Sequence, residues 1–404
     1  MAPYQTKLFL NTQESGATKE YGVRQRALLN EHAFALAKAE ITSWPGYAKT
    51  PLMQLDGLAS ALGVGSVVCK HEGFRFGIGS FKPTGPTYAM LAVLKGEIAR
   101  ATGIDTISTK DLVQRKYGQI TGELVVAAAT SGNHGRALAW GAQTFGCRAV
   151  LYMNDGVSAG REEAIVGYGG EVVRVPGAYD QAVQRMQQDA ETKGYFVIGE
   201  QGTVSYPQIP THIMQGYALV VDELVEQSVT PLTHLFVPGG GGILAAACCG
   251  YLWERFGGDG PRLIVVEPTM SSCLYESARL GRLTRVGEAS SVMDGLVVEE
   301  PSAPALEMLG AGAFAFLTIP DEAAVDAMRQ AVDPESGDPP AVIGDTGAAG
   351  WAGFLAAASD EGRRRQLGLT VDSRVAVVVT EGATDPTVYR RLTGKHPEQV
   401  MGAT

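Results

Sequence analysis

The stretch LVVAAATSGNHGRALAWGAQTF (residues 124–145) passes from an apolar run through a glycine-containing turn into a segment with helical spacing. The run LVVAAA shows no polar alternation, which indicates a strand that is covered on both faces. The same order of strand, turn and helix recurs along the chain. Chains that alternate strands and helices in this way form parallel sheets with right-handed crossovers. The pattern therefore predicts an α/β protein.

Other segments with these features lie on both sides of this stretch. The further expected strands are residues 66–69, 148–153, 171–175, 195–198, 234–237, 263–266 and 375–379. The expected helices are residues 31–40, 136–145, 159–168, 179–192 and 211–227. Ligands of open parallel sheets bind beyond the carboxyl ends of the strands, so we expect function in the turns that follow strands.

Composition excludes several classes of protein. Of the 404 residues, 45% are hydrophobic, which is too apolar for a disordered chain. No apolar stretch approaches the roughly 20 residues that span a bilayer. The net charge of −10 disfavours a nucleic-acid surface. The five cysteines form no CxxC pair, and the first residues lack the apolar core of a signal peptide. We therefore expect a cytoplasmic protein with reduced cysteines that binds neither nucleic acid nor membranes.

The densest group of the 51 glycines is VPGGGGI (residues 237–243), between an expected strand and a helix. Four successive glycines expose backbone N–H groups, and the N-terminus of the following helix adds positive partial charge. This arrangement predicts an anion site that suits phosphate. The loop lacks both the Gly-Lys-Ser/Thr of a Walker loop and the spacing of a dinucleotide site, which disfavours ATP and NAD. A flexible linker is the alternative interpretation.

The turn TSGNHG (residues 130–135) offers two hydroxyls, a carboxamide and an imidazole around two glycines. Side-chain and backbone donors in such a turn can bind a carboxylate. The alternative is that Thr130 and Ser131 only cap the helix that follows. The turn by itself leaves both interpretations open.

A third segment, GSFKPTG (residues 79–85), places Lys82 among phenylalanine, proline and glycines. A lysine is usually a solvated surface residue. An amine that is partly shielded from water is instead a nucleophile for carbonyl groups. Only the combination with the other two motifs favours the second interpretation of Lys82.

Together the three motifs resemble the fold-type II pyridoxal-phosphate (PLP) enzymes, the tryptophan-synthase-β-like superfamily. Local matches resemble most closely its diaminopropionate ammonia-lyase and threonine–serine dehydratase branch. These matches are RFG (75–77), GNHGR (132–136), IPT followed by IMQGY (209–217), and TEG with the nearby TD (380–385). The resemblance extends from about residue 45 to about residue 390.

The resemblance implies two three-layer α/β/α domains with mainly parallel twisted sheets and PLP in the cleft between them. The large, discontinuous PLP-binding domain would comprise residues 1–88 and 187–404. The small domain, residues 89–186, would carry the TSGNHG turn as the substrate loop. Relatives are commonly dimers, so we expect a homodimer.

The resemblance also implies roles for individual residues. Lys82 would hold PLP as a Schiff base and act as the base at the substrate Cα, and Ser131 is the second catalytic candidate. The expected cofactor-binding residues are Phe81, Lys82, Asn133, Gly239, Gly240, Gly241, Gly242, Gly295 and Thr380. The expected substrate-binding residues are Thr130, Ser131, Asn133, His134, Glu200 and Asp345. No motif indicates a metal site.

Two departures from the branch bear on the substrate. Where the ammonia-lyases carry an aspartate before GNHG, this chain has Ser131. The loss removes a negative partner for a β-ammonium group and the obvious base for a D-amino acid. A further branch aspartate corresponds to Glu200. We therefore expect an L-amino acid with a β-hydroxyl or another leaving group.

The function we expect is α,β-elimination that yields a 2-oxo acid and ammonia. The resemblance places the neutral Thr380 hydroxyl at the pyridine nitrogen, which favours β-elimination or β-replacement over transamination. An aspartate there would keep that nitrogen protonated and spread the carbanion into the ring. One alternative is β-replacement of the cysteine-synthase type. Another is a PLP-binding protein without turnover. The sequence does not identify the amino acid.

Overall fold

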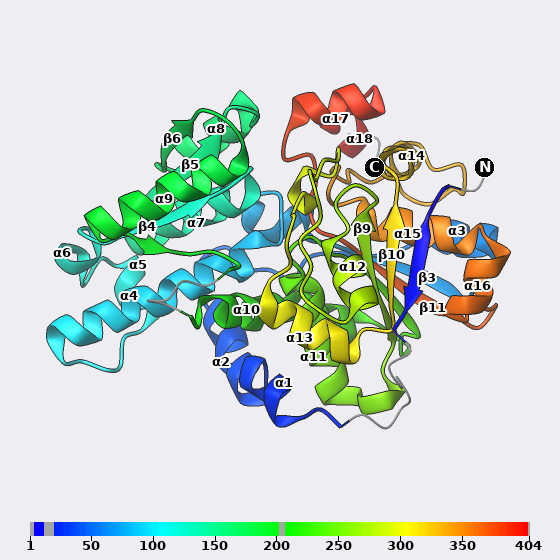
Figure 1. Cartoon of the computed structure of the whole chain (residues 1–404), viewed down its shortest axis with the longest axis horizontal. Coiled ribbons are helices and arrows are strands. Elements are labelled where there is room, and N and C mark those ends of the chain that lie inside the picture. Colours follow the sequence, from blue (N-terminus) through cyan, green and yellow to red (C-terminus); the bar gives the residue numbers. More distant parts are fainter. Residues whose placement is uncertain (1–3, 12–19, 202–206, 403–404) are drawn as a thin grey trace. The chain divides into compact units, whose positions relative to one another are not determined.

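The computed structural model describes residues 4–11, 20–201 and 207–402. Contacts divide the chain into two units (Figure 1). Unit 1 consists of Met1–His32, Lys49–Phe81 and Tyr217–Thr404, and unit 2 consists of Ala33–Ala48 and Lys82–Gly216.

Unit 2 contains a four-stranded sheet in the order β6-β5-β4-β7, with every pair parallel. Its strands are β4 (Val125–Ala129), β5 (Arg148–Asn154), β6 (Glu171–Val175) and β7 (Phe196–Val197). The helices α7 (Asn133–Phe145) and α9 (Tyr179–Lys193) contact β4 and β5, and α8 (Ala159–Val166) contacts β6. Because helices cover the central strands, β4 and β5 are buried almost throughout, as their continuous apolar runs predict.

Several further helices complete unit 2. They are η2 (Lys82–Thr84), α4 (Pro86–Thr102), α5 (Thr109–Val113) and α6 (Gly118–Thr121). Two helices belong to both units: α2 (Glu31–Thr42) and α10 (Ile209–Gln227). Within α10, the unit boundary falls between Gly216 and Tyr217.

Unit 1 contains a seven-stranded sheet in the order β1-β10-β9-β8-β11-β3-β2. Its strands are β1 (Lys7–Leu10), β2 (Leu52–Gln54), β3 (Ser66–His71), β8 (His234–Pro238), β9 (Arg262–Pro268), β10 (Ala315–Ile319) and β11 (Arg374–Val379). The five central strands are parallel, and only the two edge strands run antiparallel to their neighbours. The α/β class with mainly parallel sheets is thereby confirmed.

The helices of unit 1 lie between and beside these strands. They are α1 (Val23–Leu28), α3 (Asp56–Leu62), η1 (Glu72–Gly77), α11 (Ile243–Phe256), η3 (Gly257–Asp259), α12 (Cys273–Leu280), η4 (Asp294–Leu296), α13 (Ala303–Gly312), α14 (Asp321–Val332), α15 (Ala349–Ala358), α16 (Glu361–Leu367), α17 (Pro386–Thr393) and α18 (Pro397–Met401).

The helix α15 lies directly on the sheet of unit 1, where it contacts β8, β9, β10 and β11. All ten of its residues are buried, as expected for a helix that is apolar on every side. Glycine makes the close approach possible. A Cβ on Gly350 would lie 2.9 Å from the Phe236 carbonyl oxygen and 3.0 Å from that of Val378.

The expected strands and helices are present, most of them within two residues of the expected bounds. The largest shift is in α7, which begins at Asn133 rather than Arg136. Three strands were not expected. Two of them, β1 and β2, are short edge strands, and β10 continues the apolar run that begins in α13, so periodicity could not separate strand from helix.

The units of the structure change at Phe81/Lys82 and Gly216/Tyr217, whereas the expected domain bounds were 88/89 and 186/187. Pairing of β7 with β4 places residues 196–197 in the sheet of unit 2. Contacts of α4 with α7 place residues 86–102 in the same unit. Both assignments to unit 2 depend on contacts between residues that lie far apart in the sequence.

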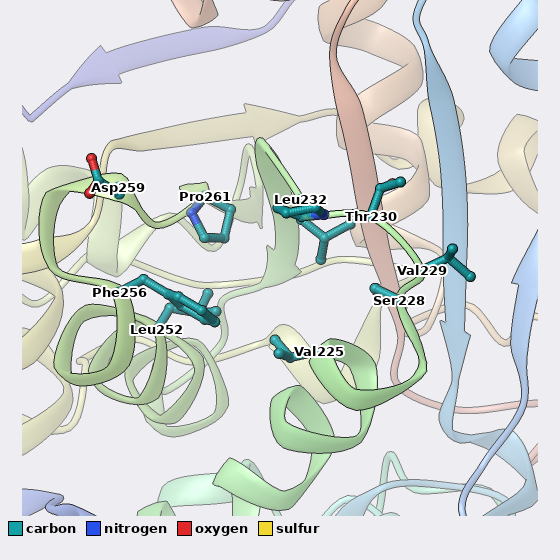
Figure 2. Close-up of a pocket in the computed structure, with 10 residues that line it drawn as sticks. Val225, Ser228, Val229, Thr230, Leu232, Leu252, Phe256, Asp259 and Pro261 are labelled. Carbon is teal, nitrogen blue, oxygen red and sulfur yellow. The ribbon is translucent and has the colours of Figure 1, made fainter.

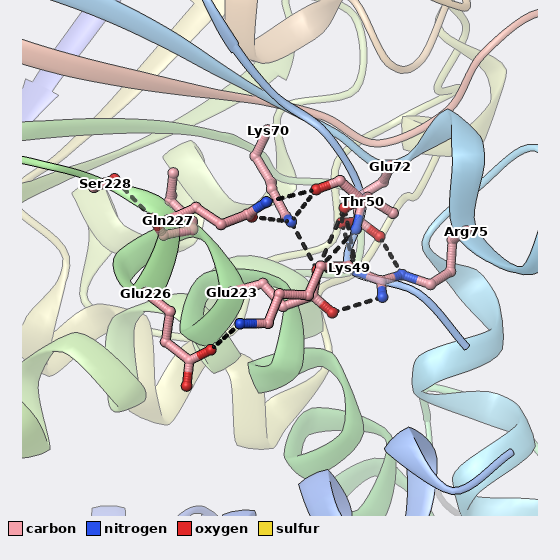
Figure 3. Close-up of polar contacts among 10 residues, drawn as sticks. Lys49, Thr50, Lys70, Glu72, Arg75, Glu223, Glu226, Gln227 and Ser228 are labelled. Carbon is pink, nitrogen blue, oxygen red and sulfur yellow. Dashed lines mark hydrogen bonds and ion pairs between the residues drawn. The ribbon is translucent and has the colours of Figure 1, made fainter.

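A cluster of buried polar side chains ties three segments of unit 1 together (Figure 3). We call it the buried charge cluster, and its members are Thr50, Lys70, Glu72, Arg75, Glu223 and Gln227. Its four charged side chains are at most 1% exposed. Two cations face two carboxylates, so the formal charges balance.

Each charge in the cluster has several partners. The Lys70 amine donates to Glu223 Oε2 at 2.7 Å, to Gln227 Oε1 at 2.7 Å and to the Thr50 carbonyl oxygen at 2.9 Å. The Arg75 guanidinium binds both oxygens of Glu223 and both oxygens of Glu72, at 2.7 to 2.9 Å. Each of these charges needs partners, because an unpaired buried charge strongly destabilises the folded protein.

Removal of one cation should destabilise the fold strongly. We expect Lys70→Met to lower the free energy of unfolding by about 3–5 kcal/mol, because Glu223 would keep its charge with one partner fewer. Lys49→Met, which breaks the exposed pair with Glu226, is the control and should change it by less than about 1 kcal/mol. Urea unfolding measures both, and equal losses would contradict the prediction.

Candidate functional site

The expected site residues fall into two groups, one in each unit. Unit 2 contains Lys82, Thr130, Ser131, Asn133, His134 and Glu200. Unit 1 contains Phe81, Gly239, Gly240, Gly241, Gly242, Gly295, Asp345 and Thr380. The peptide bond between Phe81 and Lys82 links the two groups.

In unit 2, the Lys82 amine contacts a carboxylate. Its Nζ donates to Glu200 Oε1 at 2.6 Å. The two side chains are 19% and 23% exposed, so the pair is largely but not completely shielded from water. Lys82 begins the short helix η2, and Glu200 follows β7. An amine with a carboxylate at this distance has an adjacent group that can accept and return its proton.

In unit 1, the residues just before Lys82 pair with the segment after β11. The Phe81 N–H donates to the Thr380 carbonyl oxygen at 3.0 Å, and the Gly382 N–H donates to that of Gly79 at 3.0 Å. Ser80 and Glu381 form an antiparallel bridge. This pairing places the start of the Lys82 segment at the carboxyl end of β11, where parallel sheets bind ligands.

The TSGNHG turn of unit 2 is held by the Thr130 hydroxyl. Its Oγ1 accepts hydrogen bonds from the N–H groups of Gly132 at 3.0 Å and Gly135 at 3.1 Å. A Cβ on Gly135 would lie 2.6 Å from Thr130 Cγ2, so only glycine fits there. Gly132 has a φ of +152°, a conformation that favours glycine. Thr130 therefore shapes the turn, although the N-cap of α7 is Gly132 rather than Thr130 or Ser131.

The turn precedes the N-terminus of α7, whose positive partial charge favours an anion. The Arg161 guanidinium donates to the Ser131 carbonyl oxygen at 3.0 Å, and its stem lies 3.1 Å from the Cβ position of Gly132. Asn133 is the first residue of α7. The turn thus combines a helix N-terminus with an arginine that fixes its backbone.

The His134 ring is part of the scaffold of the turn. Its Nε2 lies 2.8 Å from the Ile198 carbonyl oxygen, which can only accept, so Nε2 carries the proton. Burial and the nearby charge of Lys82 lower the pKa of His134 to about 4. The ring is therefore neutral near pH 7, and its other nitrogen is an acceptor. A carboxylate at this turn would bind backbone N–H groups rather than this ring.

In unit 1, the glycine loop follows β8 and precedes α11. Gly240 and Gly242 have φ values of +61° and +94°, which favour glycine. The loop is closed by the Gly242 N–H, which donates to the Gly239 carbonyl oxygen at 3.1 Å. Within the described part of the chain, the N–H groups of Gly240 and Gly241 have no hydrogen-bond acceptor. This loop has the free donors of an anion site.

Behind the glycine loop lies Glu267, which sequence reasoning missed. Its carboxylate accepts from the N–H groups of Leu274 at 2.9 Å and Tyr275 at 2.7 Å, in the first turn of α12. A Cβ on Gly239 would lie 2.7 Å from Glu267 Cγ. Burial raises the pKa of Glu267 to about 8, although these N–H groups oppose the shift. The carboxyl is therefore largely neutral behind the anion loop.

Gly295 and the segment containing Asp345 lie beside the glycine loop. The Gly295 N–H donates to Thr346 Oγ1 at 2.9 Å, and the Gly295 carbonyl oxygen lies 3.4 Å from the Cβ position of Gly240. Asp345 is buried, and its Oδ1 accepts from the Thr346 N–H at 2.7 Å. Thr346 is a second residue that the sequence did not reveal, because its contacts are with distant residues.

Thr380 has a polar atom without a partner. It is 2% exposed, and its Oγ1 makes no hydrogen bond in the described part of the chain. The Thr380 hydroxyl is therefore able to form a hydrogen bond with a bound group. Phe81 is also buried, with its ring centroid 4.6 Å from that of Tyr217.

A pocket of about 260 Å³ lies elsewhere in unit 1 (Figure 2). Its lining includes Val225 and Ser228 at the end of α10, Leu232 before β8, and Leu252 and Phe256 in α11. It lies at the amino end of β8, opposite the end where parallel sheets bind ligands. None of the expected site residues lines it.

A metal cluster and a membrane-spanning helix are both absent from the residues that the structure describes. No three His, Cys, Asp or Glu side chains there are arranged to hold a metal ion. In those same ranges, every helix is too short or too polar to cross a membrane.

Comparisons with known proteins identify the family of the chain. The family model described as pyridoxal-phosphate dependent enzyme matches residues 43–381. Diaminopropionate ammonia-lyase of Escherichia coli is 36% identical over 362 residues, which are 87% of this chain and 89% of that protein. The crystal structure of the E. coli enzyme in complex with D-serine matches with a TM-score of 0.87, at 33% identity and 98% coverage of both chains. Its complex with an aminoacrylate-PLP azomethine reaction intermediate matches with a TM-score of 0.84, at 31% identity, covering 97% of this chain and 98% of that one.

The raised pKa of Glu267 predicts a pH-dependent stability. The folded protein binds this proton more tightly than the unfolded chain, whose carboxyl has the ordinary pKa of 4.5. The free energy of unfolding should therefore fall as the pH rises from about 5 to about 8. Glu267→Gln should make that slope shallower, and the exposed Glu288→Gln should not. Urea unfolding at several pH values measures the slope, and equal slopes in all three proteins would refute the prediction.

Proposed function

Because the chain belongs to the family of pyridoxal-phosphate dependent enzymes, we propose that Lys82 binds the cofactor and acts on an L-amino acid with a leaving group at Cβ. The protein is an ammonia-lyase that catalyses α,β-elimination to a 2-oxo acid and ammonia. The observation that carries the assignment of Lys82 is its contact of 2.6 Å with Glu200.

The residues present fit the cofactor in three respects. The glycine loop has two backbone N–H groups without acceptors in the described part of the chain, and these groups can donate hydrogen bonds to phosphate oxygens. Thr380 has a buried hydroxyl without a partner in the described part of the chain, and this hydroxyl can donate a hydrogen bond to the pyridine nitrogen. Lys82 is a largely shielded amine. In this proposal, the glycine loop holds the phosphate, Asn133 the phenolic oxygen, and Phe81 and Gly295 the faces of the ring.

When bound, PLP supplies an electron sink for the negative charge that develops at the substrate Cα. We propose that Lys82 removes the proton from Cα, since it is the amine at the cofactor. Glu200 keeps that proton close to the Lys82 nitrogen and delivers it to the leaving group. General acid–base transfer of this kind needs a donor and acceptor within hydrogen-bond distance, which the pair provides.

We propose that the TSGNHG turn binds the substrate carboxylate. The N-terminus of α7 supports an anion there, and the Thr130 hydroxyl and the Arg161 guanidinium hold the turn in shape. The neutral His134 ring adds no charge to this carboxylate site. Asp345 is a proposed neighbour of the substrate side chain, supported by its burial beside Thr346 and the glycine loop.

The leaving group has two candidates. Ser131 provides no negative charge, which supports a neutral β-hydroxyl. Glu200 provides a carboxylate beside Lys82, which supports a β-ammonium group as a second candidate. The relative from E. coli is named for diaminopropionate, which carries such a group. Keto-acid formation from L-serine, L-threonine and L-2,3-diaminopropionate distinguishes the two.

We further propose that the enzyme works in the cytoplasm as a homodimer. All five cysteines are free, and four of them are buried, which supports a reducing compartment. The dimer is a prediction from the family resemblance.

Substitution of the two proposed catalytic side chains should separate cofactor binding from proton transfer. Lys82→Ala should lose both the visible absorption of the lysine-bound cofactor and the activity. Glu200→Gln should keep that absorption and lose about 10²- to 10⁴-fold in kcat, as expected for a lost general acid. Absorption spectra measure cofactor binding, and keto-acid assays measure the activity. The same assays with an added thiol distinguish elimination from β-replacement.

The exposed Glu191→Gln in the same unit is the control and should behave as the unaltered enzyme. Retention of the absorption band in Lys82→Ala would refute the assignment of the lysine. Full activity in Glu200→Gln would refute the proton transfer.

A further inference from the structure

We propose that the buried charge cluster positions Lys82, with Arg75 as the positioning residue. The inference rests on the proposed function of Lys82 as the cofactor-binding amine. It assigns to Arg75 no contact with substrate or cofactor. Arg75 would act through the six residues that connect it to Lys82.

The connecting segment has an unusual backbone. Phe76, Gly77 and Gly79 have φ values of +51°, +71° and +88°. Such values are ordinary for glycine, but Phe76 carries a side chain that disfavours the left-handed conformation. A strained residue of this kind persists only where its surroundings hold it. The residue that immediately precedes Phe76 is Arg75, which is completely buried.

Arg75 fixes the start of the segment through a planar fork. Its guanidinium binds both carboxylate oxygens of Glu223 in α10 and both of Glu72 in η1 (Figure 3). Four charge-assisted hydrogen bonds fix both the position and the orientation of the group. A lysine would keep the positive charge but could not reproduce this geometry.

The same helix fixes the end of the segment. The Phe81 ring packs against Tyr217, with centroids 4.6 Å apart, and Tyr217 and Glu223 both lie on α10. Six residues of helix separate these two attachment points by about 9 Å. The segment is therefore fastened to one rigid element at its two ends.

Pairing with residues 380–382 fastens the segment independently of the cluster. If the hydrogen bonds of residue 75 are weakened, Lys82 should therefore stay close to its native position, but its side chain should sample a wider range of positions. Displacements of about 1 Å can cost about 100-fold in rate, because reacting groups must be aligned. The expected result is slower chemistry in a protein that still folds and binds PLP.

The test compares Arg75→Lys with Asp222→Asn in the holoenzyme. Asp222 is the buried neighbour of Glu223 on α10, and it accepts a hydrogen bond from Tyr251 at 2.8 Å. Arg75→Lys should lower kcat at least tenfold, leave KM within about threefold, and shift the pH midpoint of the cofactor absorption. Asp222→Asn should change none of these, even where urea unfolding shows a similar loss of stability.

Two additions keep the test decisive. Phe76→Gly removes the side chain that confines this backbone position and alters no charge, so the segment gains conformational freedom. It should reproduce the effect on kcat if Arg75→Lys fails to fold. In the apoenzyme, the rate of reductive methylation of Lys82 by formaldehyde and cyanoborohydride, followed by mass spectrometry, should change in Arg75→Lys and Phe76→Gly and not in Asp222→Asn.

Two outcomes would overturn the proposal. One is a kcat and methylation rate within twofold of the unaltered protein in the folded variants. The other is an equal effect of Asp222→Asn at equal loss of stability. Absence of the lysine-bound cofactor band in the unaltered protein would instead refute the proposed function.

Discussion

Pairing between residues 79–81 and 380–382 is the constraint on which the site of unit 1 depends. Two hydrogen bonds and one bridge join segments that lie 300 residues apart in the chain. They place the peptide that leads into Lys82 at the carboxyl end of β11, beside the buried Thr380 hydroxyl. The sheet supplies the rigid base for this pairing, because β3 and β11 run side by side in parallel register. A lysine on a flexible loop would have no fixed backbone position.

The buried charge cluster and Glu267 show two ways in which unit 1 accommodates buried ionisable groups. Arg75 and Lys70 balance Glu72 and Glu223, and these contacts join β3, η1 and α10. No cation pairs with Glu267 in the described part of the chain, and burial raises its pKa to about 8, which favours the protonated form. The glycine loop, whose Gly240 and Gly241 N–H groups have no acceptor among the described residues, could therefore bind an anion without a full negative charge behind it.

Much of the fold could be predicted because buried parallel strands have a recognisable sequence pattern, an apolar run followed by a turn. Edge strands β1 and β2 could not, since pairing partners rather than composition define them. The site motifs could be located in advance, but the contacts of their side chains could not. Thr130 accepts two backbone hydrogen bonds, and His134 donates to Ile198. Glu267 and Thr346 have no local sequence signal at all.

The sequence by itself determined the α/β class and the positions of the three motifs, because glycine patterns and apolar periodicity are local properties. The cofactor family followed from the resemblance of these motifs to known enzymes. Only the tertiary structure decided which groups meet. Lys82 and Glu200 are 118 residues apart, and Arg75 and Glu223 are 148 apart, yet each pair lies within 3 Å. Contacts of that kind follow from strand order and helix packing, which no local pattern specifies.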